Sequence, residues 1–190
     1  MSVAFNIPNT LTWFRIACIP LVVLVYYLPY PWAQPAAAWI FGAAAITDGL
    51  DGYLARKLNQ MSKFGAFLDP VADKVTVAVA LLLVTHTDSR IIVLLVAAVI
   101  IGREITISAL REWMAGIGER GKVAVIDVAK YKKLAQMFGV AFMLHGKGNL
   151  LFGIPVYEFG LWLLVIAAGL TLWSMFVYLK DAWPKFTAKG

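Results

Sequence analysis

Long apolar stretches alternate with short polar clusters along most of the chain. A helix needs about 20 mostly apolar residues to cross a bilayer, and six stretches approach that length. Connectors rich in turn-forming residues, such as LPYPW, HTDSR and HGKGN, separate several of them. The pattern predicts six transmembrane helices, over Asn9–Leu28, Ala33–Leu58, Phe64–Thr85, Ile91–Met114, Val128–Leu144 and Val156–Leu179.

The overall composition supports this interpretation. Of the 190 residues, 61% are hydrophobic, whereas soluble domains average about 45–50% apolar residues. Pro and Gly are scattered along the chain, and we find no linker, internal repeat or low-complexity tract in the sequence. We therefore expect an all-α polytopic membrane protein that forms a single domain over residues 1–190.

The basic residues predict which side of the membrane each end of the chain faces. Fifteen of the 17 Lys and Arg lie near the termini, near the connectors after the second and fourth helices, or in helix ends beside them. The other two are Arg90 and Lys147. Because cytoplasmic flanks are enriched in Lys and Arg, both termini are expected in the cytoplasm. The membrane accounts for the net charge of +6, so no nucleic-acid partner is expected.

Four of the 11 acidic residues lie where the second and third predicted helices meet, namely Asp48, Asp51, Asp69 and Asp73. A charged side chain inside the bilayer costs about 3 kcal/mol or more by insertion scales. Spacings of three and four residues place each pair on one face of its helix. Two facing carboxylate pairs, with no nearby His or Cys, favour a hard divalent cation over zinc. Solvation, or pairing with neighbouring Lys and Arg, is the alternative.

The same stretch resembles a family signature. DGLDGYLARKLNQMSKFGAFLDPVAD matches the pattern Asp-x2-Asp-Gly-x2-Ala-Arg-x8-Gly-x3-Asp-x3-Asp, which is similar to the signature of the CDP-alcohol phosphotransferases. The resemblance implies six transmembrane helices, two bound divalent metal ions and an active site at the cytoplasmic interface. It also implies transfer of a substituted phosphoryl group from a CDP-linked donor to an alcohol, with release of CMP.

Three further segments narrow the resemblance within the family. NIPNTLTWFRI, REITISALREWMA and AQMF resemble bacterial members that use CDP-diacylglycerol as donor and sn-glycerol 3-phosphate as acceptor. The implied location is the bacterial inner membrane, and the implied assembly is a homodimer. The implied product is phosphatidylglycerol phosphate.

The resemblance also implies roles for individual residues. Asp48, Asp51, Asp69 and Asp73 would bind the two metal ions, Mg²⁺ or Mn²⁺. Asp73 would also be the general base for the attacking hydroxyl, although spacing alone leaves open which aspartate takes the proton. The CDP-diacylglycerol site would include Gly52, Ala55, Arg56 and Gly65. Further candidates for the site are Asn9, Thr10 and Arg15, and Asn9 alternatively caps the first helix.

An acceptor that carries a phosphate requires a second basic pocket, and the fourth predicted helix provides two arginines. Arg103 and Arg111 stand eight residues apart, about two helical turns, and so share roughly one face. Arg103 follows a long apolar run, where an isolated cation is costly. Glu104 is expected to pair with a residue of another helix. A helix-to-helix ion pair is the alternative role for the arginines.

The fifth predicted helix begins with three more cations. Lys130 and Lys132 resemble the basic pair that binds the acceptor in these family members. The sequence departs from the family there, since Ala129 replaces the usual glycine and Lys133 the usual threonine. Which of the three lysines contacts the acceptor phosphate therefore stays open. Attraction to anionic lipid is the alternative role for all three.

Two other functions compete with this interpretation. The first is the same chemistry with another acceptor: serine, inositol phosphate or phosphatidylglycerol. The second is a divalent-cation transporter. Transporters tend to place their sites near the bilayer midplane and to contain inverted repeats, whereas these carboxylates lie at one end of two helices and no matching repeat is found in the sequence.

Overall fold

The fold is described from a computed structural model, which covers residues 7–57, 63–116 and 128–187. Within these ranges the prediction of an all-α protein is confirmed. The six helices are α1 (Ile7–Tyr26), α2 (Ala33–Lys57), α3 (Lys63–Thr87), α4 (Ile91–Gly116), α5 (Val128–Leu144) and α6 (Tyr157–Thr187). Helix α6 continues to Thr187, eight residues beyond the predicted end at Leu179.

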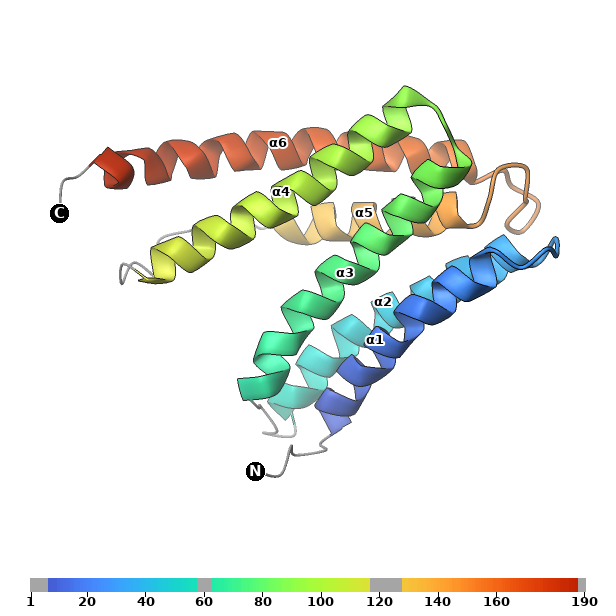
Figure 1. Cartoon of the computed structure of the whole chain (residues 1–190), viewed down its shortest axis with the longest axis horizontal. Helices are drawn as coiled ribbons and strands as arrows, with labels where there is room; N and C mark the ends of the chain where they lie inside the picture. Colours follow the sequence, from blue (N-terminus) through green and yellow to red (C-terminus); the bar gives the residue numbers. More distant parts are fainter. Residues whose placement is uncertain (1–6, 58–62, 117–127, 188–190) are drawn as a thin grey trace.

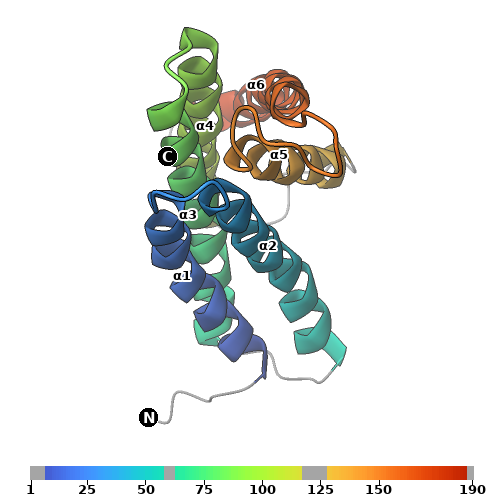
Figure 2. The same cartoon turned by 90° about the vertical axis from the view of Figure 1, so that its right-hand side faces the viewer.

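The helices run back and forth along the molecule (Figure 1). The connections α1–α2, α3–α4 and α5–α6 lie at one end, on the right of Figure 1, and the start of α1 and the end of α6 lie toward the other. Helix α1 packs along α2, and α5 packs along α6. Helix α3 contacts both α1 and α5, so it joins the two pairs (Figures 1 and 2).

A continuous apolar core holds these helices together. Its fully buried members include Ala37 and Phe41 of α2, Val84 of α3, Met143 of α5 and Leu164 of α6. Together with residues of α1 and α4, they form one cluster to which all six described helices contribute. This core fixes how α2, α3 and α5 lie relative to one another, and these helices carry most of the candidate site.

Helices α5 and α6 approach each other closely at two glycines. A Cβ atom added to Gly160 would lie 2.8 Å from the carbonyl oxygen of Gly139, and one added to Gly139 would lie 2.8 Å from the side chain of Leu164. Small residues allow helix backbones to pack this closely in membrane proteins. A larger side chain at Gly160 requires the helices to separate, whereas one at Gly139 first requires the Leu164 side chain to move.

The surface of the molecule is strongly apolar. Large side chains such as Leu24, Leu82 and Trp173 are more than half exposed, as expected for helices that face lipid. Within the described ranges, three stretches are long and apolar enough to cross a membrane: Asn9–Tyr26, Ile91–Gly116 and Tyr157–Phe176. The other helices are shorter or carry more polar residues, including the aspartates of α2 and α3. These features indicate a membrane protein.

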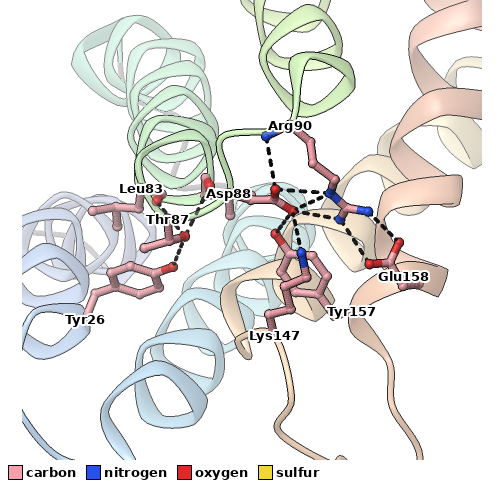
Figure 3. Close-up of polar contacts among 9 residues, drawn as sticks. Tyr26, Leu83, Thr87, Asp88, Arg90, Lys147, Tyr157 and Glu158 are labelled. Atoms are coloured by element: carbon pink, nitrogen blue, oxygen red, sulfur yellow. Dashed lines mark hydrogen bonds and ion pairs between the residues drawn. The ribbon is translucent and has the colours of Figure 1, made fainter.

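The turn between α3 and α4 is tied to the start of α6 through Asp88 (Figure 3). Its carboxylate accepts hydrogen bonds from Arg90 Nε at 2.9 Å and from the Tyr157 hydroxyl at 2.8 Å. Arg90 also pairs with Glu158, with 3.0 Å between Nη2 and Oε1. The hydrogen bonds from Arg90 lower the pKa of Asp88 to about 2. This ionic cluster fastens the end of the bundle opposite the predicted site.

Candidate active site

The carboxylates of α2 and α3 converge on shared cations. Arg15 Nη1 of α1 lies 3.0 Å from Asp48 Oδ1 and 3.3 Å from Asp73 Oδ1. Lys133 Nζ of α5 lies 2.6 Å from Oδ2 of each of the same two aspartates. Four helices therefore contribute to one cluster. The prediction from spacing that α2 and α3 present their carboxylates toward each other agrees with this geometry for Asp48 and Asp73.

Arg15 is the most deeply buried charged group of the cluster. Its side chain is 1% exposed, and a cation removed from water to this degree is costly unless it is paired and hydrogen-bonded. Contact with Asp48 and Asp73 supplies that pairing. Arg15 was one of three less specific candidates from the sequence, and the structure places it against two of the predicted metal ligands.

Asp69 is held by a residue that the sequence analysis did not identify. The Thr12 hydroxyl of α1 donates a hydrogen bond to Asp69 Oδ1 at 2.5 Å, and Thr12 is 1% exposed. Thr12 and Arg15 stand three residues apart, so they lie on one face of α1. That spacing, in a helix whose other buried residues are largely apolar, is the signal that identifies Thr12 in retrospect.

The described carboxylates fit a cation. Oxygens of both Asp48 and Asp73 lie 2.6 Å from a single nitrogen, Lys133 Nζ, so one positive centre reaches both. Carboxylate oxygens without His or Cys suit Mg²⁺ or Mn²⁺. Among the described side chains, no three acidic, His or Cys groups form a cluster able to hold a metal. The side chain of the fourth predicted ligand, Asp51, is outside that set.

A cavity of about 380 Å³ opens beside these carboxylates. Small-molecule sites typically occupy about 300–1,000 Å³. The cavity brings residues of α3, α4 and α5 together; the polar ones are Asp69, Asp73, Lys74, Arg103, Glu104, Lys133 and Gln136. Gln136, which is buried, was not predicted from the sequence. The cavity thus joins the acidic cluster to a predicted phosphate-binding arginine.

Arg103 is arranged differently from the sequence prediction. Its Nη1 lies 2.5 Å from Oε1 of Glu104, the next residue along α4. The expectation that Glu104 pairs with another helix is therefore wrong, because the long arginine side chain reaches its own neighbour. Arg103 Nε is buried and has no hydrogen-bond partner among the described residues. Native proteins usually satisfy such a donor with a ligand, ion or water.

Several predicted residues remain without a described side chain. The structure gives only their backbone in α2, α4 and α5: Asp51, Gly52, Ala55, Arg56, Arg111, Lys130 and Lys132. Gly65 is buried near the start of α3, and Thr10 is exposed. Asn9 is buried and lies inside α1, which begins at Ile7, so it does not cap the helix. The binding roles of these residues stay predictions.

Comparison with known proteins gives one consistent result. The model of the CDP-alcohol phosphatidyltransferase family matches residues 5–173, which include every residue of the cluster and cavity. The chain is 53% identical over 178 residues to proteins of Escherichia coli (strain K12) and Shigella flexneri. Both relatives are named CDP-diacylglycerol–glycerol-3-phosphate 3-phosphatidyltransferase. Each match covers 94% of this chain and 95% of the relative.

Proposed function

The chain belongs to the CDP-alcohol phosphatidyltransferase family, and we propose that it transfers the phosphatidyl group of CDP-diacylglycerol to sn-glycerol 3-phosphate. The products are phosphatidylglycerol phosphate and CMP. The observation that carries the proposal is the shared cavity, in which the carboxylate of Asp73 and the guanidinium of Arg103 line one space. An acceptor with a hydroxyl at one end and a phosphate at the other requires such a pair of groups.

We assign the binding of two divalent cations, Mg²⁺ or Mn²⁺, to Asp48, Asp51, Asp69 and Asp73. Cations bound there supply the charge that stabilises the donor diphosphate and the departing phosphate of CMP. The protein positions the ligands in advance: Thr12 holds Asp69 by its 2.5 Å hydrogen bond. Such outer contacts orient metal ligands and affect metal affinity strongly.

Asp73 is the proposed general base. Its side chain is 26% exposed and lines the cavity, so an acceptor hydroxyl can reach it. The hydroxyl oxygen forms a bond to the phosphorus that carries the diacylglycerol, and the proton passes to Asp73. The bond from that phosphorus to the bridging oxygen of the diphosphate breaks, and CMP leaves with the electron pair.

The remaining predicted residues bind the two substrates. Arginine binds phosphate through two parallel donors, so Arg103 and Arg111, with Lys130 and Lys132, are assigned to the acceptor phosphate. The nucleotide part of CDP-diacylglycerol is assigned to Gly52, Ala55, Arg56 and Gly65, where small residues leave room for the base and ribose. The assignment of Arg103 is supported by its buried Nε, which has no hydrogen-bond partner in the part of the chain that the structure describes.

We further propose that all six helices cross a bacterial inner membrane, with both termini in the cytoplasm and the site at the cytoplasmic interface. The alternating helix directions support this arrangement, as does the distribution of Lys and Arg (Figure 1). Such a position lets the site meet a lipid donor and a water-soluble acceptor. A homodimer is the proposed assembly, on the family resemblance.

The function is tested by CMP release from CDP-diacylglycerol in detergent with Mg²⁺, with acceptors added one at a time. Glycerol 3-phosphate alone should support release and yield phosphatidylglycerol phosphate. CMP release with only serine, inositol phosphate or phosphatidylglycerol would support phosphatidyl transfer but show that glycerol 3-phosphate is not the acceptor. No release with any acceptor, together with Mn²⁺ uptake into proteoliposomes, would support a transporter instead.

A further inference from the structure

Lys133 lies against the aspartate cluster, whereas the sequence left open which of Lys130, Lys132 and Lys133 contacts the acceptor phosphate. Its Nζ lies 2.6 Å from Oδ2 of Asp48 and 2.6 Å from Oδ2 of Asp73. Its side chain is 48% exposed and lines the cavity that also contains Arg103. The ammonium therefore lies at the boundary between the acidic cluster and the predicted acceptor pocket.

The ammonium and a divalent cation compete for the same oxygens. Two cations within a few ångströms of each other repel strongly, even where the effective dielectric constant is about 20. A metal ion that binds Oδ2 of Asp48 and Asp73 must therefore displace Lys133. Arg15, in contrast, contacts the Oδ1 atoms of the two aspartates. Because its side chain is only 1% exposed, it has no room to swing away and remains in place.

We propose that Lys133 is a tethered counter-cation, which a divalent metal ion displaces from Asp48 and Asp73 and which then binds a substrate phosphate in the cavity. The inference rests on the metal assignment of the proposed function. Lysine suits the role because its point charge sits on a flexible four-carbon stem. Since the cavity already contains Lys133 and Arg103, the displaced ammonium has a phosphate-binding partner within the same space.

The phosphate has two possible sources, the acceptor phosphate and the donor diphosphate. Lys133→Met removes the charge and keeps a stem of similar length, and Lys133→Arg keeps the charge. Lys74→Met is the matched control, because Lys74 lines the same cavity and the described contacts include no ion pair between it and Asp48 or Asp73. Size-exclusion chromatography and a thermal melt verify that each variant is folded.

The first measurement is Mn²⁺ binding to purified, substrate-free protein by electron paramagnetic resonance. Lys133→Met should bind Mn²⁺ on the order of tenfold more tightly than wild type, because two ion pairs that compete with the metal are removed. Lys133→Arg should bind Mn²⁺ within about threefold of wild type, and Lys74→Met should change affinity less than Lys133→Met. An unchanged Mn²⁺ affinity in Lys133→Met would overturn the proposed role of Lys133 as a counter-cation.

The second measurement is the KM of each substrate at saturating Mn²⁺. A rise of about tenfold in Lys133→Met for glycerol 3-phosphate alone would assign the ammonium to the acceptor phosphate. A rise for CDP-diacylglycerol alone would assign it to the diphosphate. Tighter Mn²⁺ binding with both KM values unchanged would overturn the phosphate contact. Failure of the proposed function is distinct, since wild type would then bind no Mn²⁺ or release no CMP.

Discussion

Replacing Asp88 with Asn should destabilise the protein at the end opposite the active site. The Asp88 side chain is 4% exposed and pairs with Arg90 Nη2 at 2.7 Å, in addition to its hydrogen bonds from Arg90 Nε and the Tyr157 hydroxyl. Asp88→Asn keeps the shape of the side chain and removes its charge. The α3–α4 turn then loses the ion pair between Asp88 and Arg90, which holds Arg90 where it also reaches Glu158 of α6, while the buried core is unchanged.

The magnitude follows from the pKa of Asp88. Folding lowers it from 3.8 to about 2, and each unit corresponds to 1.36 kcal/mol, so the charged form contributes about 2 kcal/mol. For a protein of this size, 1 kcal/mol shifts Tm by about 2–4 °C. Asp88→Asn should therefore lower Tm in detergent by about 4–8 °C at pH 7.

The pH dependence provides an independent check. Because the folded pKa is lower than the unfolded one, the contribution is complete above about pH 4 and disappears as pH falls through about 2. The Tm gap between wild type and Asp88→Asn should therefore narrow between pH 4 and pH 2. Glu158→Gln is the control; Glu158 is 54% exposed, so its loss should cost less than about 1 kcal/mol. Equal Tm values at pH 7, or a gap independent of pH, would refute the reasoning.

Three further predictions concern packing and catalysis. Gly160→Ala should lower the free energy of unfolding by about 1–3 kcal/mol, measured by thermal melt, because its Cβ would meet the Gly139 carbonyl oxygen at 2.8 Å. The control Gly169→Ala, with open space at its Cβ, should be neutral or stabilising in the same assay. A Gly160→Ala variant as stable as Gly169→Ala would contradict the close approach of α5 and α6. Thr12→Val, which removes the hydrogen bond to Asp69, should weaken Mn²⁺ binding by about tenfold or more, and unchanged affinity would show that Asp69 needs no such support. Asp73→Asn should reduce kcat for CMP release by about 10²-fold or more with its size-exclusion profile kept, and near-normal turnover would exclude Asp73 as the base.

Hydrophobic patterning and the aspartate motif predicted the fold and the acidic centre because both follow from local sequence. Apolar stretches of membrane length define helices directly, and three- and four-residue spacings fix helix faces. The end of α6 was missed because the predicted boundary was the point where apolar residues stop, which marks the edge of the bilayer. The helix itself continues past that point as long as its backbone hydrogen bonds form. Helix α6 runs on through the polar residues that follow Leu179.

The contact of Lys133 with the carboxylates was not predictable in the same way. Three lysines lie within four residues at the start of α5, and the rotation of α5 about its axis decides that Lys133 faces α3. That rotation depends on tertiary packing, including the contact of Gly139 with Gly160 and Leu164. Thr12 was missed for a related reason, since its partner Asp69 lies 57 residues away in the sequence.

The central claim is that the carboxylate cluster, loaded with a divalent cation, transfers the phosphatidyl group to glycerol 3-phosphate. The most direct test is a titration of chelator-stripped enzyme with Mn²⁺, in which bound metal and CMP release are followed together in the presence of CDP-diacylglycerol and glycerol 3-phosphate. We predict no CMP release without metal, and release that rises with metal occupancy and requires the acceptor. Full CMP release in excess chelator, or release independent of glycerol 3-phosphate, would contradict the account.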